Sequence, residues 1–530
     1  MPKTTHAKVD FAIPKEVRAI LAILQEKGFE AYVVGGCVRD LLLDRMPADW
    51  DITTNARPEE LTEIFPESFY ENKFLTVTVK TNSPDPRLAE IEVTTYRAEG
   101  RYTDQRHPDI VSYAKTLEED LSRRDFTINA IALKCDANIS RLSSKNLDNE
   151  VEDPRFGTAE SGRMHTNDTN GRELMDPFGG VSDLQAKLVR TVGDPKERFG
   201  EDALRMMRAV RIATELGFTI GEQTADAIRA HVSWIQAIAK ERIRDELIKI
   251  FKSERSAFGV ELLHDLGLLK FIMPELEEGI GVGQNKHHIY TVWEHNLRAL
   301  QWADKEKYEW PVKIAALLHD VAKPRCKQGD GLDSTFYQHD LVGGRMAAAI
   351  LERLHFPRET ISKVVKLIRW HLFKYDPDEG ITDSAIRRLV RRVGVENIDD
   401  LVLVRICDRM GSGVPKAVPY RLRHFQFRVE KIIREEEAPT PKMLALNGND
   451  VMQILGISPG PKIGFILDAL LEEVIDDPAK NSKDYLTSRT RELDKLSIDE
   501  LKALAASAES KVELIEDERE AELKSKYYVK

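Results

Sequence analysis

The spacing of apolar and polar residues divides the chain into a first part that mixes strands with helices and a second part that is helical. Residues 15–136 and 175–195 combine short β-like apolar runs with helical patterns, which indicates an α+β domain. From Glu197 onward the apolar spacing is helical to the end of the chain. The stretch 136–176 is polar and lacks apolar periodicity, so we expect a surface insertion there.

One short stretch predicts a strand, a glycine turn and a helix in direct succession. Gly35 and Gly36 join the apolar run 31–34 to a helical pattern over 37–43. Such a turn lets backbone amides approach phosphate oxygens closely. We therefore expect a phosphate site at this turn, and the helix after it adds two charged candidates for nucleotide binding, Arg39 and Asp40.

Two nearby carboxylates, Asp49 and Asp51, predict a site for divalent cations. If residues 51–53 begin a strand, its period of two turns both side chains to one face. Adjacent carboxylates repel each other unless a cation lies between them. Glu92, in the β-like run 91–96, is a candidate third ligand from a neighbouring strand. With the glycine turn, these three predicted catalytic residues indicate a two-magnesium phosphoryl-transfer site that handles a nucleoside triphosphate.

The composition agrees with an intracellular enzyme. The chain has 530 residues, of which 42% are hydrophobic, enough for several domains with cores of their own. Its four cysteines lack Cys-x-x-Cys spacing, which argues against a disulfide scaffold or a zinc ribbon. We expect a cytoplasmic protein, because no signal core or membrane-length apolar run is present. The net charge of −11 disfavours RNA binding unless basic residues gather locally, as they do in 205–211, 240–252 and 421–434.

Three further motifs follow in order along the chain. They are Asp-Leu-Ser-Arg-Arg-Asp-Phe-Thr-Ile-Asn-Ala at 120–130, Asp-Pro-Phe-Gly-Gly at 176–180, and Glu-Asp-Ala-Leu-Arg-Met-Met-Arg-Ala-Val-Arg at 201–211. With the residues above, the chain resembles the bacterial class II CCA-adding tRNA nucleotidyltransferases and the related bacterial poly(A) polymerases. The resemblance is dense over residues 15–275 and thinner beyond. It implies a polymerase-β-like nucleotidyltransferase head with a small mixed sheet and helices, followed by an all-α neck, an HD domain and a helical tail.

The resemblance also implies domain bounds. We expect a head over 15–195 that contains the 136–176 insertion, a neck for base recognition and RNA binding over 196–280, an HD domain over 285–420 and a helical tail over 421–530. In known family members the connection at 136–176 is usually short, so this chain departs from the pattern there. The charged, alanine-rich end of the tail fits a solvated helix or a helical hairpin.

Asp202, Arg205 and Arg208 are predicted to lie on one helix face. By itself, an Asp and an Arg three residues apart form an ordinary surface ion pair. However, a carboxylate accepts from the exocyclic amine that cytosine and adenine share, and a guanidinium donates to the ring nitrogen that is an acceptor in both. Such a pair admits CTP and ATP and rejects UTP and GTP. The resemblance assigns base reading to Asp202 and Arg205, and places Arg208 near the triphosphate or the base.

The motif at 120–130 contributes further nucleotide-binding candidates. Arg123 and Arg124 are suited to neutralising triphosphate charge, and Asp125 and Asn129 to holding ribose hydroxyls; the alternative is a charged helix start. Residues 96–120 resemble the flexible loop of enzymes that add the terminal A. This loop favours CCA or A addition over CC addition alone, and leaves poly(A) synthesis open.

A second metal site is predicted in the helical part. His319 and Asp320 end the apolar helical run 314–318, with His295 before them and Asp408 far downstream. These four residues resemble the metal ligands of the HD phosphohydrolase superfamily, and the alternative is a set of helix-packing histidines. Imidazoles with carboxylates suit Mn, Ni, Co or Fe better than magnesium alone. Two more histidines are candidates for a two-metal version, His339 and His371.

The function that we expect is template-independent addition of CCA to the 3′ end of tRNA, from CTP and ATP with Mg²⁺ in the head. Poly(A) synthesis, or A addition by an enzyme that needs a CC-adding partner, are the nearest alternatives. An alternative from a different functional class is a phosphohydrolase in which the HD domain is the main catalyst. It would act on 2′-phosphates or 2′,3′-cyclic phosphates, and the head would serve as a nucleotide sensor. The intact pair Asp49 and Asp51 argues against that last alternative. The oligomeric state stays open.

Overall fold

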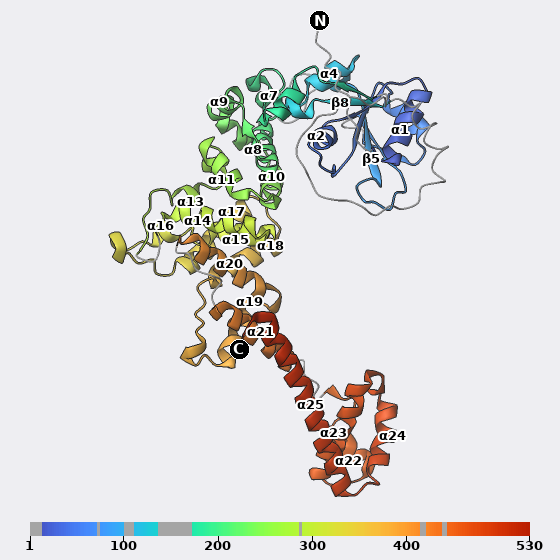
Figure 1. The fold of residues 1–530 in the computed structure, drawn as a ribbon, viewed down its shortest axis with the longest axis vertical. Coiled ribbons are helices and arrows are strands. Elements are labelled where there is room, and N and C mark those ends of the chain that lie inside the picture. Colours follow the sequence, from blue (N-terminus) through green and yellow to red (C-terminus); the bar gives the residue numbers. More distant parts are fainter. Residues whose placement is uncertain are drawn as a thin grey trace, which may run out of the picture. The chain divides into compact units, whose positions relative to one another are not determined.

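The computed structural model describes residues 13–71, 75–99, 111–135, 172–285, 289–413, 420–436 and 443–529. Most of the predicted insertion and the centre of the predicted flexible loop therefore lie outside the described residues. Backbone contacts divide the chain into two compact units, Met1–Val365 and Lys366–Lys530. This division is coarser than the four segments expected from the sequence, whose bounds stay predictions. Figure 1 labels the elements of both units.

The head is built on a mixed sheet. Seven strands within the described residues form it, in the order β3-β4-β5-β2-β1-β8-β9. Strands β2 and β5 are parallel, and the other neighbouring pairs are antiparallel. The prediction of a small mixed sheet is confirmed. The strands are β1 Ala31–Val34, β2 Asp51–Thr54, β3 Ser68–Glu71, β4 Thr76–Lys80, β5 Glu90–Thr95, β8 Ala132–Cys135 and β9 Arg172–Met175.

Strand β9 corrects one expectation. Its residues, Arg172–Met175, fall within the stretch 136–176 that we expected to be a surface insertion, yet they pair with β8 along its whole length and belong to the sheet. A strand of four residues at the edge of a sheet has too few positions to show periodicity. Pairing with β8, far from β9 in the sequence, decides its conformation.

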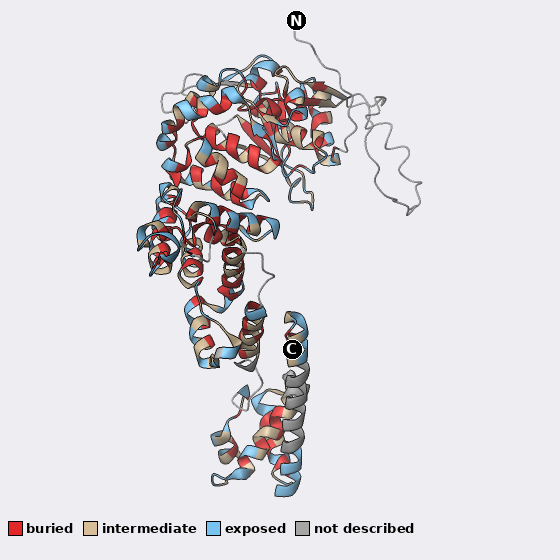
Figure 2. Ribbon diagram, turned by 60° about the vertical axis from the view of Figure 1, so that its left-hand side comes forward, coloured by how far each residue is buried: buried red, intermediate tan, exposed pale blue. Residues whose placement is uncertain are grey.

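The alternation of side chains gives the two faces of the sheet different characters. Ile52, Val77 and Val93, in β2, β4 and β5, are completely buried, and Figure 2 shows this buried interior in red. Helix α1, Lys15–Glu26, adds its own buried stripe of Val17, Ile20, Leu21 and Leu24. The residues next to them in the strands point the other way and include threonines and carboxylates, because the side-chain period of a strand is two.

Short helices connect the strands of the head. They are α2 Gly36–Leu42, α3 Pro58–Ile64, α4 Leu117–Ser122, the 3-10 turn η1 Thr127–Asn129 and α6 Gly180–Gln185, together with the small hairpin of β6 Arg97–Glu99 and β7 Val111–Tyr113. The motif at 176–180 is explained by packing here. A Cβ at Gly180 would lie 2.2 Å from the backbone oxygen of Thr127, so only glycine lets α6 approach η1 this closely. Asp176 accepts hydrogen bonds from the backbone nitrogens of Gly180 and Val181, at 2.7 and 2.9 Å.

The neck is helical with one interruption. Its helices are α7 Pro195–Glu201, α8 Leu204–Leu216, α9 Glu222–His231, the 3-10 segment η2 Val232–Ala237, α10 Lys240–Lys252, α11 Ser256–Asp265, α12 Leu269–Ile272 and α13 Pro274–Glu277. Strand β11, Thr219–Ile220, pairs in parallel with β10, Leu188–Val189. The expectation of helices alone after Glu197 was therefore wrong at this point. Gly217 ends α8 in a left-handed conformation, and the chain then returns to the head.

The helices that follow complete the first unit. They are α14 Val292–Lys305, α15 Trp310–Leu318, α16 Lys323–Cys326, the 3-10 turn η3 Gly331–Asp333, α17 His339–Arg353 and the first part of α18 Arg358–Trp370. A buried joint fastens α14 and α15 to the neck. Asp304 accepts hydrogen bonds from the Ser256 hydroxyl, at 2.6 Å, and from the backbone nitrogen of Ala257, at 2.9 Å. The Lys313 ammonium lies 2.8 Å from the same carboxylate.

The second unit is helical throughout its described part. It contains the 3-10 turns η4 Pro377–Glu379, η5 Val395–Asn397 and η7 Pro478–Lys480, and the helices α19 Asp383–Val393, α20 Ile398–Gly411, α21 Tyr420–Glu436, α22 Gly448–Leu455, α23 Pro461–Asp476, α24 Lys483–Leu493 and α25 Ile498–Tyr527. Val451, Ile466, Leu470 and Leu486 belong to a shared core of α22 to α24. The predicted helical tail is confirmed. Across the described ranges of both units, no helix joins the length and apolarity that crossing a membrane requires.

Candidate active site and metal cluster

The predicted catalytic carboxylates of the head meet on neighbouring strands. Asp51 and Glu92 are register partners in the parallel pair β2 and β5, as expected from the sequence. A cavity of about 350 Å³ opens over them. Its lining is mostly polar and comprises Val34, Asp51, Ile52, Thr76, Thr78, Glu92, Thr94, Arg97, Arg123 and Arg124. The cavity therefore combines acidic groups for a cation with three arginines for an anion.

Asp49 lies just before strand β2, which begins at Asp51. The alternation of side chains along the strand therefore does not include Asp49, which is exposed. The two carboxylates still influence each other. Burial raises the pKa of Asp51 to about 6; the Arg124 guanidinium opposes this change, and the carboxylates of Asp49 and Glu92 add to it. A divalent cation would relieve this repulsion, and oxygen ligands of this kind suit Mg²⁺.

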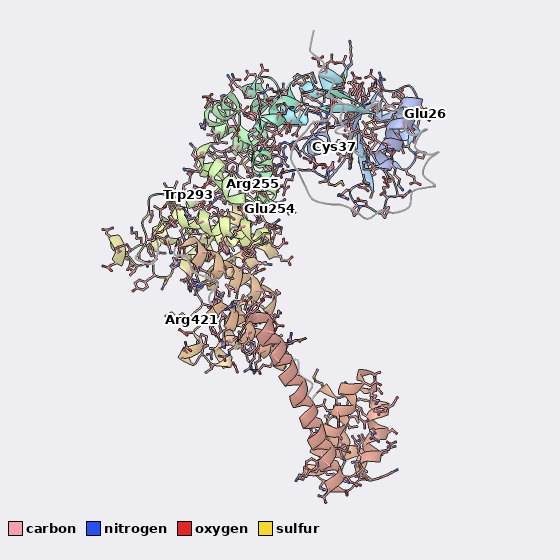
Figure 3. All side chains as sticks on the ribbon, viewed as in Figure 1. Glu26, Cys37, Glu254, Arg255, Trp293 and Arg421 are labelled. Carbon is pink, nitrogen blue, oxygen red and sulfur yellow. The ribbon has the colours of Figure 1, made fainter. Side chains whose placement is uncertain are left out.

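The glycine turn brings the start of α2 against the same site. Gly35 has a φ of +88°, and a Cβ there would lie 2.8 Å from Nη1 of Arg124 and 3.5 Å from Oδ2 of Asp51. Glycine is therefore required both for the backbone conformation and for the approach of the two side chains. Gly36 is the first residue of α2, and the next residue, Cys37, is labelled in Figure 3. Burial raises the pKa of the Cys37 thiol to about 12, so this residue is not a nucleophile.

Asp120 positions two of the three arginines of the cavity, Arg123 and Arg124. Its carboxylate is fully buried, lies 2.9 Å from Nη2 of Arg123 and 3.9 Å from Nη2 of Arg124, and accepts a hydrogen bond from the Thr53 hydroxyl at 3.1 Å. Burial lowers the pKa of Arg124, and the Asp120 carboxylate opposes that change. Sequence reasoning assigned no role to Asp120, although it stands three and four residues before the arginines, the spacing of helical ion pairs.

A chain of polar contacts joins the glycine-turn helix to the neck. Arg39 donates to Asp40 and to Asn129, each at 2.8 Å. Asn129 in turn donates to Asp125 at 3.2 Å, and Nε of Arg208 donates to the same carboxylate at 2.7 Å. Burial would raise the pKa of Asp125, but the guanidinium of Arg208 holds it well below its usual range. The structure thus brings these five predicted residues together, as a bridge within the protein.

The base-reading candidates are arranged differently from our expectation. Asp202 does not lie on a helix face with Arg205: it follows α7 in an extended conformation, and α8 begins only at Leu204. Its carboxylate accepts from the Leu204 backbone nitrogen, at 3.0 Å, and forms a paired contact with Arg242 of α10, at 2.7 and 3.3 Å. Arg205 instead pairs with Glu201 and donates to the backbone oxygen of Arg123, at 3.3 Å. The break between α7 and α8 leaves Asp202 outside both helices.

A buried group that we call the histidine cluster lies among α14, α15 and α17 of the first unit. It consists of His295, His319, Asp320 and His339. Nε2 of His295 lies 3.0 Å from Nε2 of His319, and the two nitrogens lie 3.2 and 3.3 Å from Oδ2 of Asp320. Nε2 of His339 lies 3.3 Å from Oδ1 of Asp320. Two imidazole nitrogens and a carboxylate that converge on one point fit a metal ion.

Backbone contacts select the histidine tautomers that metal binding needs. Nδ1 of His319 lies 2.7 Å from the backbone oxygen of Ala316, and Nδ1 of His339 lies 2.6 Å from that of Phe336. Because a carbonyl only accepts, Nδ1 carries the proton and Nε2 keeps its lone pair for a metal. Burial would raise the pKa of Asp320, but His319 and Lys323 hold it well below its usual range, so the carboxylate is ionised.

Two predicted ligands belong to the second unit. Asp408 is buried on α20, where Arg405 donates to it at 2.7 Å. His371 follows α18, and its Nδ1 lies 2.6 Å from the backbone oxygen of Ile368, the same tautomer-selecting contact as in His319 and His339. Their roles as metal ligands stay predictions.

Comparison with known protein families finds four matches in order along the chain. The Poly A polymerase head domain matches residues 31–160, and the "Probable RNA and SrmB- binding site of polymerase A" matches residues 217–280. The HD domain matches residues 292–411, and a second domain of tRNA nucleotidyltransferases matches residues 417–489. The head match includes the whole carboxylate site, and the HD match includes the histidine cluster.

Individual relatives match over most of the chain. The CCA-adding enzyme of Lactobacillus helveticus is 42% identical over 483 residues, which are 90% of this chain and 96% of that protein. The A-adding tRNA nucleotidyltransferase of Deinococcus radiodurans is 33% identical over 374 residues, 69% of this chain and 76% of that protein. Among solved structures, the Bacillus stearothermophilus CCA-adding enzyme in complex with CTP is similar with a TM-score of 0.50 and 26% identity, over 91% of this chain and 97% of that one.

Proposed function

We propose that this chain, which belongs to the bacterial family of CCA-adding tRNA nucleotidyltransferases, completes the 3′-CCA end of tRNA from CTP and ATP. The observation that carries the proposal is the cavity in which Asp51 and Glu92 lie beside Arg123 and Arg124. Full CCA addition is favoured over A addition alone because the CCA-adding relative is 42% identical over 90% of the chain, and the A-adding relative 33% identical over 69%. The predicted cytoplasmic location suits an enzyme that acts on tRNA.

Asp49, Asp51 and Glu92 are the residues that would hold Mg²⁺ in the head. Bound there, the metal would lower the pKa of the RNA 3′-hydroxyl and stabilise the departing pyrophosphate. The raised pKa of Asp51 supports this assignment, because the carboxylates are poorly neutralised by the protein alone. Arg123 and Arg124, held by Asp120, are placed to neutralise the triphosphate, while the glycine turn supplies backbone amides.

Asp202 and Arg205 are the proposed readers of the incoming base, with Arg208 close by. Their donor and acceptor pattern suits cytosine and adenine. In this structure Asp202 is held by Arg242 and Arg205 by Glu201, so a base must replace part of these contacts. The proposed ribose ligands, Asp125 and Asn129, are likewise joined to Arg208 and Arg39.

A second activity is favoured by the histidine cluster. Its imidazole nitrogens and ionised carboxylate suit Mn, Ni, Co or Fe, and would support hydrolysis of a 2′-phosphate or a 2′,3′-cyclic phosphate at an RNA end. The buried Lys323 ammonium, 2.6 Å from Oδ2 of Asp320, adds a cation for such a phosphate. Asp408 and His371 stay predicted ligands from sequence.

Product analysis on defined tRNAs tests the main proposal. The substrates are one tRNA truncated before the first C, one before the second C and one before the final A, each given CTP, ATP or both. We expect completion of all three to CCA with both nucleotides, and a stop after CC with CTP alone. Long A tracts would indicate a poly(A) polymerase, and extension of only the third substrate would indicate an A-adding enzyme. Absence of pyrophosphate release, with phosphate release from RNA ends, would favour the phosphohydrolase with a nucleotide-sensing head.

A further inference from the structure

One face of the head sheet carries a line of side chains that starts at the metal carboxylates and ends at the sheet edge. Asp51 of β2 pairs with Glu92 of β5, Glu92 pairs with Thr78 of β4, and Thr78 pairs with Phe69 of β3. Directly paired residues project to the same face. We call these four residues the pocket row. Three strand spacings separate its ends, a span of about 14 Å.

The face around the pocket row is shaped for a polar ligand. The next row on the same face consists of Thr53, Thr94 and Thr76, and the hydroxyls of Thr76 and Thr94 lie 3.1 Å apart. Thr76, Thr78 and Thr94 all line the cavity over the carboxylates. Threonine is common in strands, and the opposite face also carries Thr54 and Thr95, but those two are buried and donate to backbone oxygens of the protein, whereas Thr76, Thr78 and Thr94 open to the cavity. The hydroxyls therefore mark the side of the sheet that receives a ligand.

Phe69 gives the far end of the pocket row a different character. Phe69 lies on the edge strand β3 and is 41% exposed. Nζ of Lys80 lies 5.8 Å from the centre of the Phe69 ring. An exposed aromatic ring beside a lysine is the combination that proteins use for single-stranded nucleic acids, where a base stacks on the ring and a cation attracts the phosphate. One exposed aromatic residue is common on surfaces, but this one continues a line from a catalytic site.

The order of the strands separates the two substrates of the reaction. The glycine turn follows β1, which lies on one side of β2, and the contacts from Arg39 through Asp125 to the neck start from this side. Thr78 and Phe69 lie on the other side of β2. In phosphoryl transfer the attacking and leaving oxygens are roughly in line, so nucleophile and pyrophosphate approach the metal from opposite sides. If the triphosphate occupies the glycine turn, the RNA arrives from the pocket row.

We propose that the 3′ end of the RNA substrate lies along the pocket row, with its reactive hydroxyl at Asp51 and Glu92, a ribose 2′-hydroxyl at Thr78 and a base stacked on Phe69. This inference rests on the proposed nucleotidyltransferase function. It adds an RNA-binding site with one residue for the base and one for the sugar. Thr78 and Phe69 are positioning residues, because they hold the substrate and take no part in the bond exchange.

Replacement of Phe69 tests the stacking part. The full chain is given tRNA that lacks the final A, with ATP and magnesium, and KM is measured separately for tRNA and for ATP. We expect Phe69→Ala to raise KM for tRNA about tenfold and Phe69→Tyr to restore it, with KM for ATP unchanged. Ile23→Ala, which removes an apolar side chain of similar exposure, 38%, from helix α1, is the matched control. A rise in KM for ATP instead would place the incoming nucleotide on the row and overturn the proposal.

Replacement of Thr78 tests the contact with the ribose 2′-hydroxyl. The measured quantity is the penalty for a 2′-deoxy sugar, which a general loss of stability would not change. Primers with a 2′-deoxy sugar at each of the last two positions are compared with all-RNA primers. For the wild-type chain we expect one deoxy substitution to lower kcat/KM several-fold, and in Thr78→Val this penalty should disappear. An equal penalty in both proteins would exclude the contact. A wild-type chain that adds no nucleotide to any primer would refute the proposed function itself, whereas normal addition with unchanged variants would refute the pocket row alone.

Discussion

The carboxylate site of the head and the histidine cluster both gather ionised groups, but they differ in whether other protein groups balance the negative charge of the carboxylates. In the head, Asp51 lies beside two other carboxylates in an open cavity, and its pKa is raised to about 6. In the histidine cluster, Asp320 is 1% exposed, and the neighbouring His319 and the Lys323 ammonium hold its pKa well below its usual range. The head leaves negative charge uncompensated, and the cluster compensates it within the protein.

This difference indicates how each site exchanges its ligands. Strands that lie in register place oxygen ligands at the floor of an open cavity, where a hydrated magnesium ion can arrive with each nucleotide. Helices that hold imidazoles by backbone contacts build a closed set of nitrogen ligands, suited to one resident transition metal. On the proposed assignments, we expect the head to take up magnesium with each nucleotide and the histidine cluster to retain a bound transition metal.

The largest effect should follow removal of the uncompensated charge. We expect Asp51→Ala to reduce nucleotide addition about a thousandfold, about 4 kcal/mol in the barrier, because the metal loses its central ligand. The melting temperature of the metal-free protein should not fall, because partial burial and the neighbouring carboxylates of Asp49 and Glu92 disfavour the ionised form of Asp51. Glu90→Ala removes an exposed carboxylate from the same face of β5 and is the control. Turnover above a few per cent of wild type would contradict the assignment.

The second test separates the two metals. The double variant His319→Ala, Asp320→Ala should lose the transition metal of the purified protein, measured by elemental analysis, together with any hydrolysis of 2′,3′-cyclic phosphates or 2′-phosphates. CCA addition should persist, because the head uses other residues. The chain offers a matched control in another His-Asp pair, His264 and Asp265, whose replacement should leave the metal in place. A parent protein without such metal or phosphatase activity would reduce the cluster to a structural element.

A third variant tests whether the protein itself neutralises Asp320. Lys323 is buried and pairs with Asp320 at 2.6 Å. Lys323→Ala should lower the free energy of unfolding of the metal-free protein by about 3 kcal/mol, because an ionised carboxylate loses its buried partner. Bound Mn²⁺ should reduce this deficit, as the ion supplies the missing charge. Chemical denaturation with EDTA or Mn²⁺ measures both values, and Arg325→Ala, which breaks an exposed pair, serves as control. Equal deficits in the two buffers would argue against a metal beside Asp320.

The smallest effect concerns base selection in the neck. Asp202→Ala or Arg205→Ala should relax discrimination against UTP and GTP by about 2 kcal/mol, the value of one paired base contact. Arg242→Ala should act in the same direction, because the Asp202 carboxylate then loses the contacts that orient it. Competition between CTP and UTP measures the ratio, with Arg244→Ala on the same helix as control. A lower rate with unchanged selectivity would show that another element reads the base.

Sequence patterns over short stretches were enough to predict the elements that carry the carboxylates of the head. The apolar run before Gly35 and the helical pattern after it are contiguous, so the strand, turn and helix could be recognised without tertiary information. The β-like run around Glu92 correctly placed a third carboxylate on a neighbouring strand. The four-residue strand β9 was missed, because its conformation depends on pairing with β8.

The other arrangements that we did not predict from the sequence depend on contacts between residues far apart in the chain. Asp202 was expected on a helix face, but its partner Arg242 lies forty residues away, and a helical pattern does not reveal the break between α7 and α8 in which Asp202 lies. Arg39 and Asn129 were predicted as separate nucleotide ligands, and their contact across ninety residues was not foreseen. The role of Asp120 could have been found from its spacing to Arg123 and Arg124.

The buried joint at Asp304 has a consequence for how the protein can be divided. Sequence families place a boundary between residues 280 and 292, and a fragment that ends there would seem a natural piece to produce. Such a cut would separate Asp304 and Lys313 from Ser256 and from the backbone oxygen of Ser253, to which Lys313 donates at 2.7 Å. Helix α11 would then lose the carboxylate that caps its first turn. The boundary between the two sequence families therefore falls inside one compact unit of the structure, Met1–Val365.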